Sequence, residues 1–587
     1  MNSLEQLRQW IPSSERLIKA AEDNREVVAA VAGVVTLAGA VRIYNKRSKA
    51  PKLQGKSIKD IPGPKHLPFI GNALEFTQDS LAAYMEDLAW KYGEMTYIYL
   101  GPKRVLVASS PTVIDTLVKE RPNVYKRPLD AERIFKDSKI NGLFSMEGNS
   151  QLTRLSGDDW RHSRAWLSPQ LAAGKINKTK VLIAKHAIEL RKNLDQYAEE
   201  LENLQKKWYH SENSDFNGRY TRSNFYNPNE LKTTVDLFGV YAFSVVVDFS
   251  FAHDKEHCLP ENILEDLKVV FSVMRRRLFG IVPWYRYGIK DADDHKFEAT
   301  IQSIKESVQR IIEEYDPKTF EDNSDKMSTM LESLWYSLNH TAPEQVEVPG
   351  MASVTKAAGK MSFDAMVSNL LTVISAGYGK CNDTTANTLQ AVSYMLSKHP
   401  HVQERLHAEV DAVLGDPEAR KNMTEEEIIE KLQENLFAQF PYATAVVNET
   451  QRIHPVTPFV GMEAINDTIL DGYVIPKGTT IMGLSRVASL NYCPTPDPFQ
   501  FKPERWIECT VEQRRQQDRL DWSFGGGPRV CPGRHLANLE LVSAVVLVFS
   551  LYNLKELDRA PSAPPVIEGA SFTSTIDNVY IRYIPRA

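Results

Sequence analysis

The residues most able to do chemistry lie in one short turn, F-G-G-G-P-R-V-C-P-G, which runs from Phe524 to Gly533. It contains a single cysteine, Cys531, between three glycines and the predicted start of a helix at Gly533. A cysteine can be a nucleophile, a metal ligand or an inert core group. Helix N-terminal N–H groups and nearby cations lower the pKa of a thiol and stabilise the thiolate. We therefore expect Cys531 to act as a thiolate.

The neighbours of Cys531 match the needs of a flat ligand with an anionic edge. Glycines such as Gly527 let the backbone approach a planar group closely. Arg529 can reach an anionic group at the edge of the ligand, and Phe524 can cover an apolar face. These are the requirements of a haem iron held by a cysteine thiolate. We predict haem b as the cofactor, with Cys531 as the axial ligand of its iron.

The full pattern, F-x-x-G-x-R-x-C-x-G, resembles the signature of the cytochrome P-450 superfamily of haem-thiolate monooxygenases. The resemblance covers roughly residues 60 to 587 and is closest to the microsomal eukaryotic type. The composition of the motifs looks fungal. The family's fold is mainly helical, so this fold is expected here.

Three further motifs support the resemblance. E-T-Q-R supplies Glu449 and Arg452, F-K-P-E-R-W supplies Arg505, and W-R-H-S-R supplies Trp160 and Arg164. Taken alone, Glu449 and Arg452 would be an ordinary i, i+3 surface pair. The resemblance implies that they form a buried triad with Arg505 for folding and haem retention. It also implies that Trp160 and Arg164 face the haem propionates.

The oxygen-binding side of the site departs from the family pattern. The resemblance assigns proton delivery to Asp383 and Thr384, although Asp383 could also be a helix N-cap. The family's glycine corresponds to Gly377, but it lies six positions before Asp383, so residues 379–382 look inserted. In a straight helix, four extra residues shift the face by roughly 6 Å. Alternatively, they bulge out and leave Asp383 and Thr384 over the iron.

A second departure is at Met462, where many relatives place a cation for a haem propionate. We expect haem anchoring to rely more on Arg164 and Arg529.

Composition excludes several other classes. The chain has 587 residues, 42% of them hydrophobic and 25% charged, with a net charge of −5. No basic footprint indicates nucleic acid. The five cysteines are scattered and form no C-x-x-C pair, which argues against a disulfide framework or a structural zinc site. A reducing, cytosol-facing environment fits this pattern best.

The N-terminal region predicts a membrane anchor. A polar segment, 1–26, precedes an apolar segment, 27–44, that extends roughly 27 Å as a helix, close to the roughly 30 Å of a bilayer core. A buried helix or a signal-peptide core are the other interpretations. Lysines and arginines follow it, which places the C-terminal side in the cytosol. We expect a single-pass protein of the endoplasmic reticulum membrane, with a basic, proline-rich linker at 45–72 and the haem domain at 73–587.

Hydrophobic periodicity predicts a mainly α protein with small β-sheets, in one large domain. The proline-rich segment 61–72 should form no helix. Helices are expected at 81–93, 181–208, 297–315, 368–400 and 533–552, and strands within 95–101, 104–110 and 468–484.

These observations predict a membrane-anchored monooxygenase. It would hydroxylate a lipophilic molecule, such as a fatty acid, steroid, terpenoid or xenobiotic. No flavin domain follows Cys531, so an NADPH-cytochrome reductase, or a cytochrome b-type donor, is expected to supply electrons. The alternatives are a haem-thiolate isomerase or dehydratase that needs no external electrons, and a haem sensor.

The segment 274–288 is a candidate substrate lid. Its arginine run, Arg275 to Arg277, can meet a substrate carboxylate or face solvent and lipid headgroups.

Overall fold

The structure is a computed structural model. It describes residues 53–76, 80–101, 103–121, 123–128, 164, 166–176, 179–212, 234–251, 259, 263–279, 284–314, 329–339, 361–376, 384–433, 435–556, 567–570, 574–577 and 579–586. The predicted anchor, 27–44, lies outside these residues, as do Trp160, Gly377, the apparent insertion 379–382 and Asp383.

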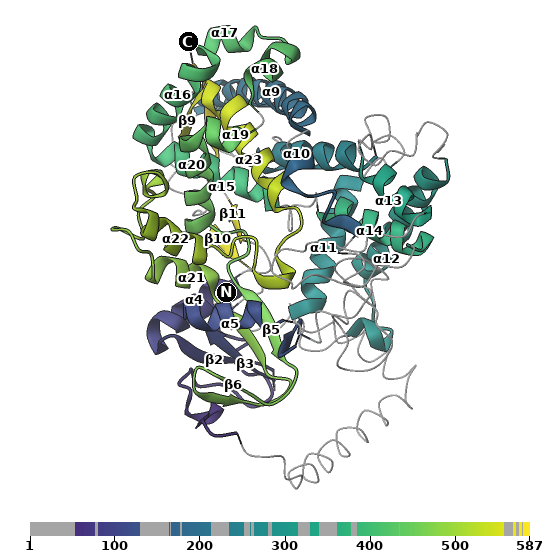
Figure 1. The fold of residues 1–587 in the computed structure, drawn as a ribbon, viewed down its shortest axis with the longest axis vertical. Helices are drawn as coiled ribbons and strands as arrows, with labels where there is room; N and C mark the ends of the chain where they lie inside the picture. The colour runs from purple at the N-terminus through teal and green to yellow at the C-terminus, as the bar shows by residue number, and fades with distance from the viewer. Residues whose placement is uncertain are drawn as a thin grey trace.

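Helices dominate the described part of the chain, which confirms the predicted class (Figure 1). The α-helices are α4 (Leu81–Tyr92), α5 (Pro111–Lys119), α8 (Ala173–Ile176), α9 (Lys180–Glu212), α10 (Thr234–Phe251), α11 (Ile263–Phe279), α12 (Ala292–Glu313), α13 (Met330–Asn339), α14 (Phe363–Ala376), α15 (Thr384–Lys398), α16 (Pro400–Leu414), α17 (Pro417–Lys421), α18 (Glu425–Lys431), α19 (Leu436–Gln439), α20 (Pro441–Ile453), α21 (Ser485–Asn491), α22 (Val511–Arg519) and α23 (Arg534–Leu547). The 3₁₀ turns are η2 (Ile58–Asp60), η6 (Trp284–Tyr287), η9 (Pro503–Trp506), η10 (Gly527–Arg529) and η11 (Phe549–Leu551).

The strands form small sheets beside the helices. They are β1 (Lys56–Ser57), β2 (Met95–Leu100), β3 (Lys103–Ala108), β4 (Tyr125–Lys126), β5 (Val460–Ala464), β6 (Thr468–Leu470), β7 (Tyr473–Ile475), β8 (Thr480–Gly483), β9 (Tyr552–Glu556), β10 (Ile567–Ala570), β11 (Ser574–Asp577) and β12 (Ile581–Pro585). The largest sheet has the order β2-β3-β8-β5-β4. It lies with α4 and α5 at one end of the molecule, and α11 to α14 form a separate group on one side (Figure 1).

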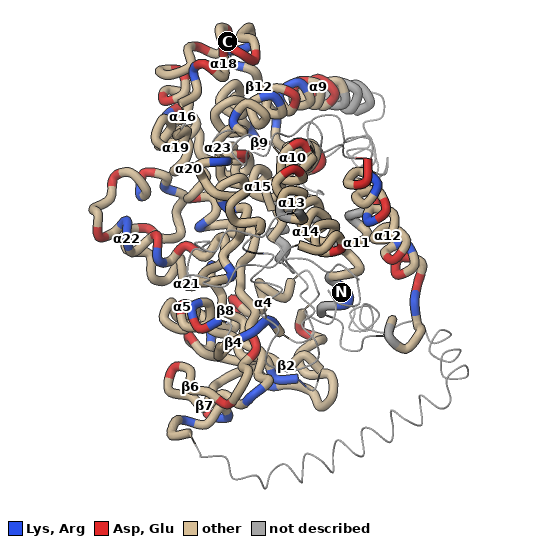
Figure 2. Tube along the Cα trace, turned by 45° about the vertical axis from the view of Figure 1, so that its right-hand side comes forward, with Lys and Arg blue, Asp and Glu red and all other residues tan. Residues whose placement is uncertain are grey.

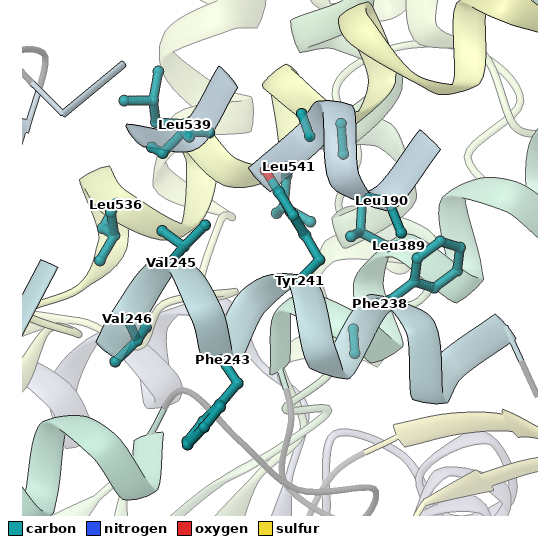
Figure 3. Packing of buried hydrophobic residues seen from close by; sticks show 14 of the residues in the cluster. Leu190, Phe238, Tyr241, Phe243, Val245, Val246, Leu389, Leu536, Leu539 and Leu541 are labelled. Atoms are coloured by element: carbon teal, nitrogen blue, oxygen red, sulfur yellow. The ribbon is translucent and has the colours of Figure 1, made fainter. Parts of the chain in front are cut away.

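The core is built around α10, whose largely apolar sequence is consistent with burial of most of its residues. Figure 3 shows Phe238 of α10 beside Leu389 of α15, and Tyr241 and Val245 beside residues of α23. Within the described residues, α10 and the segment 534–551 are long and apolar enough to cross a membrane. Both are mostly buried, as core helices are.

The central helix differs from the prediction in its continuity. We expected one helix over 368–400, whereas the structure describes α14, which ends at Ala376, and α15, which begins at Thr384. The residues between them lie outside the described part, so both geometries of the apparent insertion remain as predicted alternatives.

The proline-rich segment has no helix, as its prolines predict. It packs tightly on β2, however. Ile61 is buried, the Thr96 hydroxyl donates to the Pro62 carbonyl at 2.9 Å, and the Asn72 N–H donates to the Tyr99 carbonyl at 2.8 Å. In this part the predicted linker is integrated into the fold.

Candidate functional site

The turn before α23 holds Cys531 in a fixed position. The Cys531 N–H donates to the Phe524 carbonyl at 2.8 Å, and the Val530 N–H donates to the Gly527 carbonyl at 3.1 Å. Gly527 has φ +61°, and a Cβ there would lie 2.1 Å from the Val118 carbonyl oxygen. Glycine is therefore required for the turn to rest against the end of α5.

The environment of the Cys531 thiol differs from the prediction. Desolvation raises the pKa of this thiol above its ordinary value, although part of the residue is exposed. The Gly533 backbone N–H and the charges of Arg164 and Arg534 act in the predicted direction, but their combined effect is smaller. Because a metal ligand must be deprotonated, a bound cation would have to displace the proton from this sulfur.

Arg164 provides the clearest requirement for an anion. Arg164 is only 4% exposed, and its Nε atom has no hydrogen-bond partner among the residues that the structure describes. Burial lowers the pKa of Arg164, and the charge of a Cys531 thiolate acts against this lowering. A buried guanidinium without a carboxylate is costly unless a ligand supplies the negative charge.

The donor set therefore fits a haem. Cys531 offers one soft sulfur for the iron, and Arg164 offers a guanidinium for a propionate at the edge of the ring. Phe524 is half-buried in the turn, with the Arg534 guanidinium 5.8 Å from its ring centre. Arg529 is half-buried in η10.

Met462 has a cationic neighbour, Arg121, from a distant part of the chain. The Arg121 Nε donates to the buried Met462 sulfur at 2.7 Å. Burial, assisted by the charge of Arg127, lowers the pKa of Arg121 to about 9. The sequence did not indicate this pair, because Arg121 follows α5 and only the pairing of β4 with β5 brings it near Met462.

Thr384 is the first residue of α15 and is exposed. Its carbonyl accepts a hydrogen bond from the Thr388 hydroxyl at 2.6 Å. The next residue, Thr385, donates through its hydroxyl to the buried Glu540 carboxylate at 3.0 Å. Glu540 lies on α23, so this bond joins the helix of Thr384 to the helix that Cys531 precedes. Sequence reasoning missed Glu540, which no local motif distinguishes.

The structure brings Glu449, Arg452 and Arg505 together in a buried cluster. Glu449 is fully buried, and it accepts from the Nε of Arg452 at 2.9 Å and from the Nε of Arg505 at 2.7 Å. The Trp506 indole and the Lys502 backbone N–H also donate to this carboxylate, at 2.9 Å and 3.0 Å. Five donors on one carboxylate make the charge of Glu449 well compensated.

Gln517 of α22 extends this cluster. Its side-chain amide donates to the Arg505 carbonyl at 3.0 Å. Its Oε1 and the Nη1 of Arg452 have no partner within the described part of the chain, and both residues line one cavity of about 20 Å³. A donor and an acceptor beside a cavity of this size suit one buried water.

The arginines of the candidate lid are engaged in ion pairs. Arg276 binds Asp291 at 2.5 Å and Asp294 at 3.0 Å, and Arg277 binds Asp294 at 2.8 Å. Arg277 also stacks on the rings of Tyr285 and Phe297. These contacts join α11 to the start of α12, and they make these two arginines poor partners for a substrate carboxylate.

Comparison with known proteins agrees with the motifs. The model of the family described as "Cytochrome P450" matches residues 61–580. The chain is 25% identical to cytochrome P450 3A15 of Cavia porcellus over 519 residues, which covers 84% of this chain and 86% of the relative. It is similarly 25% identical over 524 residues to the putative cytochrome P450 CYP13A7 of Caenorhabditis elegans, with 85% and 89% covered.

Proposed function

Because the chain belongs to the cytochrome P450 family, we propose that it hydroxylates a lipophilic small molecule with O2 and electrons from an NADPH-dependent reductase. Members of this family bind haem through a cysteine thiolate, and the chain is a haem monooxygenase, an oxidoreductase. The substrate class, the electron donor, the membrane anchor and the residue roles below are parts of the proposal.

The pairing of Cys531 with Arg164 carries the assignment of the haem site. The turn holds the sulfur at the start of α23, and the buried guanidinium, whose Nε lacks a partner among the described residues, interacts with its charge. We assign iron ligation to Cys531 and propionate binding to Arg164, Arg529 and Trp160, and Phe524 and Gly527 would shape the turn that holds the haem. When bound, the haem supplies O2 activation, which thiolate donation favours.

Asp383 and Thr384 are assigned to proton delivery. A hydroxyl at the first turn of α15 can orient a water molecule and pass on its proton. The Thr385–Glu540 bond supports this role, because it fixes the first turn of α15 relative to the helix that follows Cys531. Glu449, Arg452 and Arg505 are assigned to haem retention through the packing of the turn.

Two observations support an uncharged, lipophilic substrate held near a membrane. Ion pairs with Asp291 and Asp294 neutralise Arg276 and Arg277 in the candidate lid. The apolar segment 27–44 suits a single-pass anchor in the endoplasmic reticulum, with the haem domain in the cytosol. Electron donors would dock near the exposed Arg534, where basic side chains attract acidic partners.

The spectrum of the reduced carbon monoxide complex tests the ligand. We expect Cys531→Ala to lose the red-shifted Soret band that thiolate ligation produces. Cys509→Ala, at a half-buried cysteine of the same chain, is the matched control and should keep the band. Retention of the band by Cys531→Ala would overturn the ligand assignment, and Cys381 would be tested next.

Product analysis tests the reaction. The purified protein with a reductase should convert a lipophilic compound from a lipid panel to a hydroxylated product, only when NADPH is present. A product formed without NADPH would favour the isomerase or dehydratase alternative.

A further inference from the structure

Cys493 is a thiol with two polar neighbours in the loop that follows α21. The Arg505 Nη1 donates to the Cys493 sulfur at 3.6 Å, and the Thr495 hydroxyl oxygen lies 3.3 Å from the same sulfur. Cys493 is half-buried, so part of it remains accessible to a small reagent. Reactive cysteines are typically partly exposed and lie beside a cation. Cys493 meets both conditions.

Cys493 lines the cavity of about 20 Å³ that Arg452 and Gln517 also line. These two residues are only 8% and 3% exposed. The Arg452 Nη1 is a donor without a hydrogen-bond partner in the described part of the chain, and the Gln517 Oε1 is an acceptor without one. About 10–15 Å³ of this kind of volume holds one water molecule. The cavity therefore has room for one oxygen atom between a donor and an acceptor.

A sulfenic acid on Cys493 would suit this cavity. Its oxygen is bonded to the sulfur, accepts a hydrogen bond through its lone pairs and donates one through its hydrogen. It can accept from the Arg452 Nη1 and donate to the Gln517 Oε1, the two buried groups that need a partner. The sulfenic oxygen would thus replace the water that the reduced site suits.

The residue after Cys493 is a proline, which limits what the sulfenic acid can become. A sulfenic acid condenses with a thiol, or with a backbone nitrogen to give a cyclic sulfenamide. Closing that ring removes the hydrogen from the nitrogen of the following residue, and Pro494 has no such hydrogen. This route is therefore closed to Cys493, and reaction with a small thiol remains.

We propose that Cys493 is a modification site for peroxide, at which the oxygen of a sulfenic acid occupies the cavity lined by Arg452 and Gln517. The Cys493 thiol and H2O2 give the sulfenic acid and water. The sulfur loses two electrons and gains an S–O bond, while the O–O bond of the peroxide breaks. A small thiol reverses the change in two steps, which release water and the disulfide of that thiol. The inference goes beyond the proposed function and does not depend on it.

Chemical trapping tests the proposal on the full-length haem protein. The protein is treated with H2O2 while imidazole occupies the iron, the peroxide is removed with catalase, and the chain is unfolded in dimedone, which labels sulfenic acids. Peptide mass spectrometry should show several-fold more label on Cys493 than on Cys509, a half-buried cysteine that does not line this cavity. Dithiothreitol added before dimedone should prevent the labelling. Equal labelling of the two cysteines, or no label on Cys493, overturns the proposal.

Variants of Gln517 test the part that the cavity plays. Gln517→Leu removes the acceptor, so under continued peroxide its sulfenic acid should be oxidised further to the sulfinic acid several-fold faster than in the parent. Gln517→Glu keeps an acceptor and should restore part of the lifetime. Gln516→Leu is the matched control, because Gln516 is exposed on the same helix, and it should behave as the parent does.

Haem content and the thermal midpoint show whether each variant is folded. Equal sulfenic acid lifetimes in folded Gln517→Leu and in the parent overturn the role of the cavity. The comparison of Cys493 with Cys509 in the parent decides the proposal even where Gln517→Leu fails to fold.

Discussion

The charge of Arg164 interacts with that of a Cys531 thiolate, and the Arg164 Nε is without a partner among the described residues. The resemblance to a known motif predicted a role for this residue in haem binding, and its burial without a partner for Nε is consistent with that proposal. Arg121, by contrast, could not be predicted, because its contact with Met462 joins segments far apart in the sequence. A short motif can indicate a residue proposed to bind a ligand. It does not indicate an arginine that reaches its partner only because distant segments pair in the folded protein.

Replacing Arg164 should loosen the haem without removing the thiolate. Loss of a charged hydrogen bond of about 1.5–3 kcal/mol predicts haem dissociation faster by about tenfold or more in Arg164→Met. Arg164→Lys keeps the charge and should lose haem more slowly than Arg164→Met. Transfer of haem to excess apomyoglobin measures the rates. Equal rates in the parent and both variants would show that Arg164 does not hold a propionate.

Helix boundaries illustrate what the sequence could predict at the scale of elements. The periodic segments became α4, α9 and α12 close to the expected limits, because their apolar faces pack on the core. The prediction of one continuous helix over 368–400 differs from the structure, which describes α14 and α15 as separate helices. Residues 377–383, G-Y-G-K-C-N-D, are mostly small or polar. They lie between two apolar segments, and helical periodicity alone does not reveal an insertion there.

Removal of the buried acid should destabilise the whole cluster around Glu449. Glu449→Gln leaves Arg452 and Arg505 buried beside a neutral amide, which should cost about 3–5 kcal/mol of unfolding free energy. Lys119→Gln, which breaks the exposed pair with Asp115, should change the free energy by less than about 1 kcal/mol. Urea unfolding, followed by the haem spectrum, compares the two variants. If both variants lost less than about 1 kcal/mol of unfolding free energy, Glu449 would not stabilise the cluster as proposed.

The junction of α16 with β9 should make stability depend on pH. Burial lowers the pKa of His407 from 6.5 to about 4, and the Nε2 of its neutral ring lies 3.1 Å from the Tyr552 carbonyl. Between these values the unfolded chain binds a proton that the folded chain does not, so stability falls as the pH falls. The loss between pH 7 and pH 5 should be about 2 kcal/mol.

The variant His407→Gln keeps an amide donor for Tyr552 but cannot titrate. Its urea midpoint should therefore change less than that of the parent between pH 7 and pH 5. If parent and variant lose stability equally over this range, His407 is not the responsible group.

At the scale of the molecule, acidic and basic residues are interspersed over the outer helices, for example along α12 (Figure 2). This mixed surface fits the absence of a basic footprint in the composition. Residues before position 73, in the predicted linker, also take part in the fold. β1 pairs with β7 in parallel, and the Lys56 N–H donates to the Gly472 carbonyl at 2.8 Å. The sequence did not indicate this pairing, because a strand of two residues has no periodic pattern.

Truncation should separate the anchor from the fold. Deleting residues 1–52 should move the protein toward the soluble fraction and leave haem binding intact, since β1 remains. Deleting residues 1–60 removes β1 and η2 as well and should lower the thermal midpoint relative to the shorter deletion. Fractionation, the carbon monoxide spectrum and calorimetry measure these outcomes. Haem loss after the shorter deletion would show that the N-terminal segment belongs to the fold.

The close approach of Gly527 to Val118 also affects how a random-mutagenesis library of this protein should be read. Every substitution at position 527 would drive a side chain into backbone, whereas a Cβ at Gly525 meets nothing closer than 4.0 Å. A screen for haem-binding clones should thus recover only glycine at 527 but some asparagine at 525, which tolerates positive φ. Loss of all substitutions at position 527 would reflect a steric clash between the new side chain and the backbone of Val118. A score based only on how rarely substitutions are recovered would misread this clash as catalytic importance.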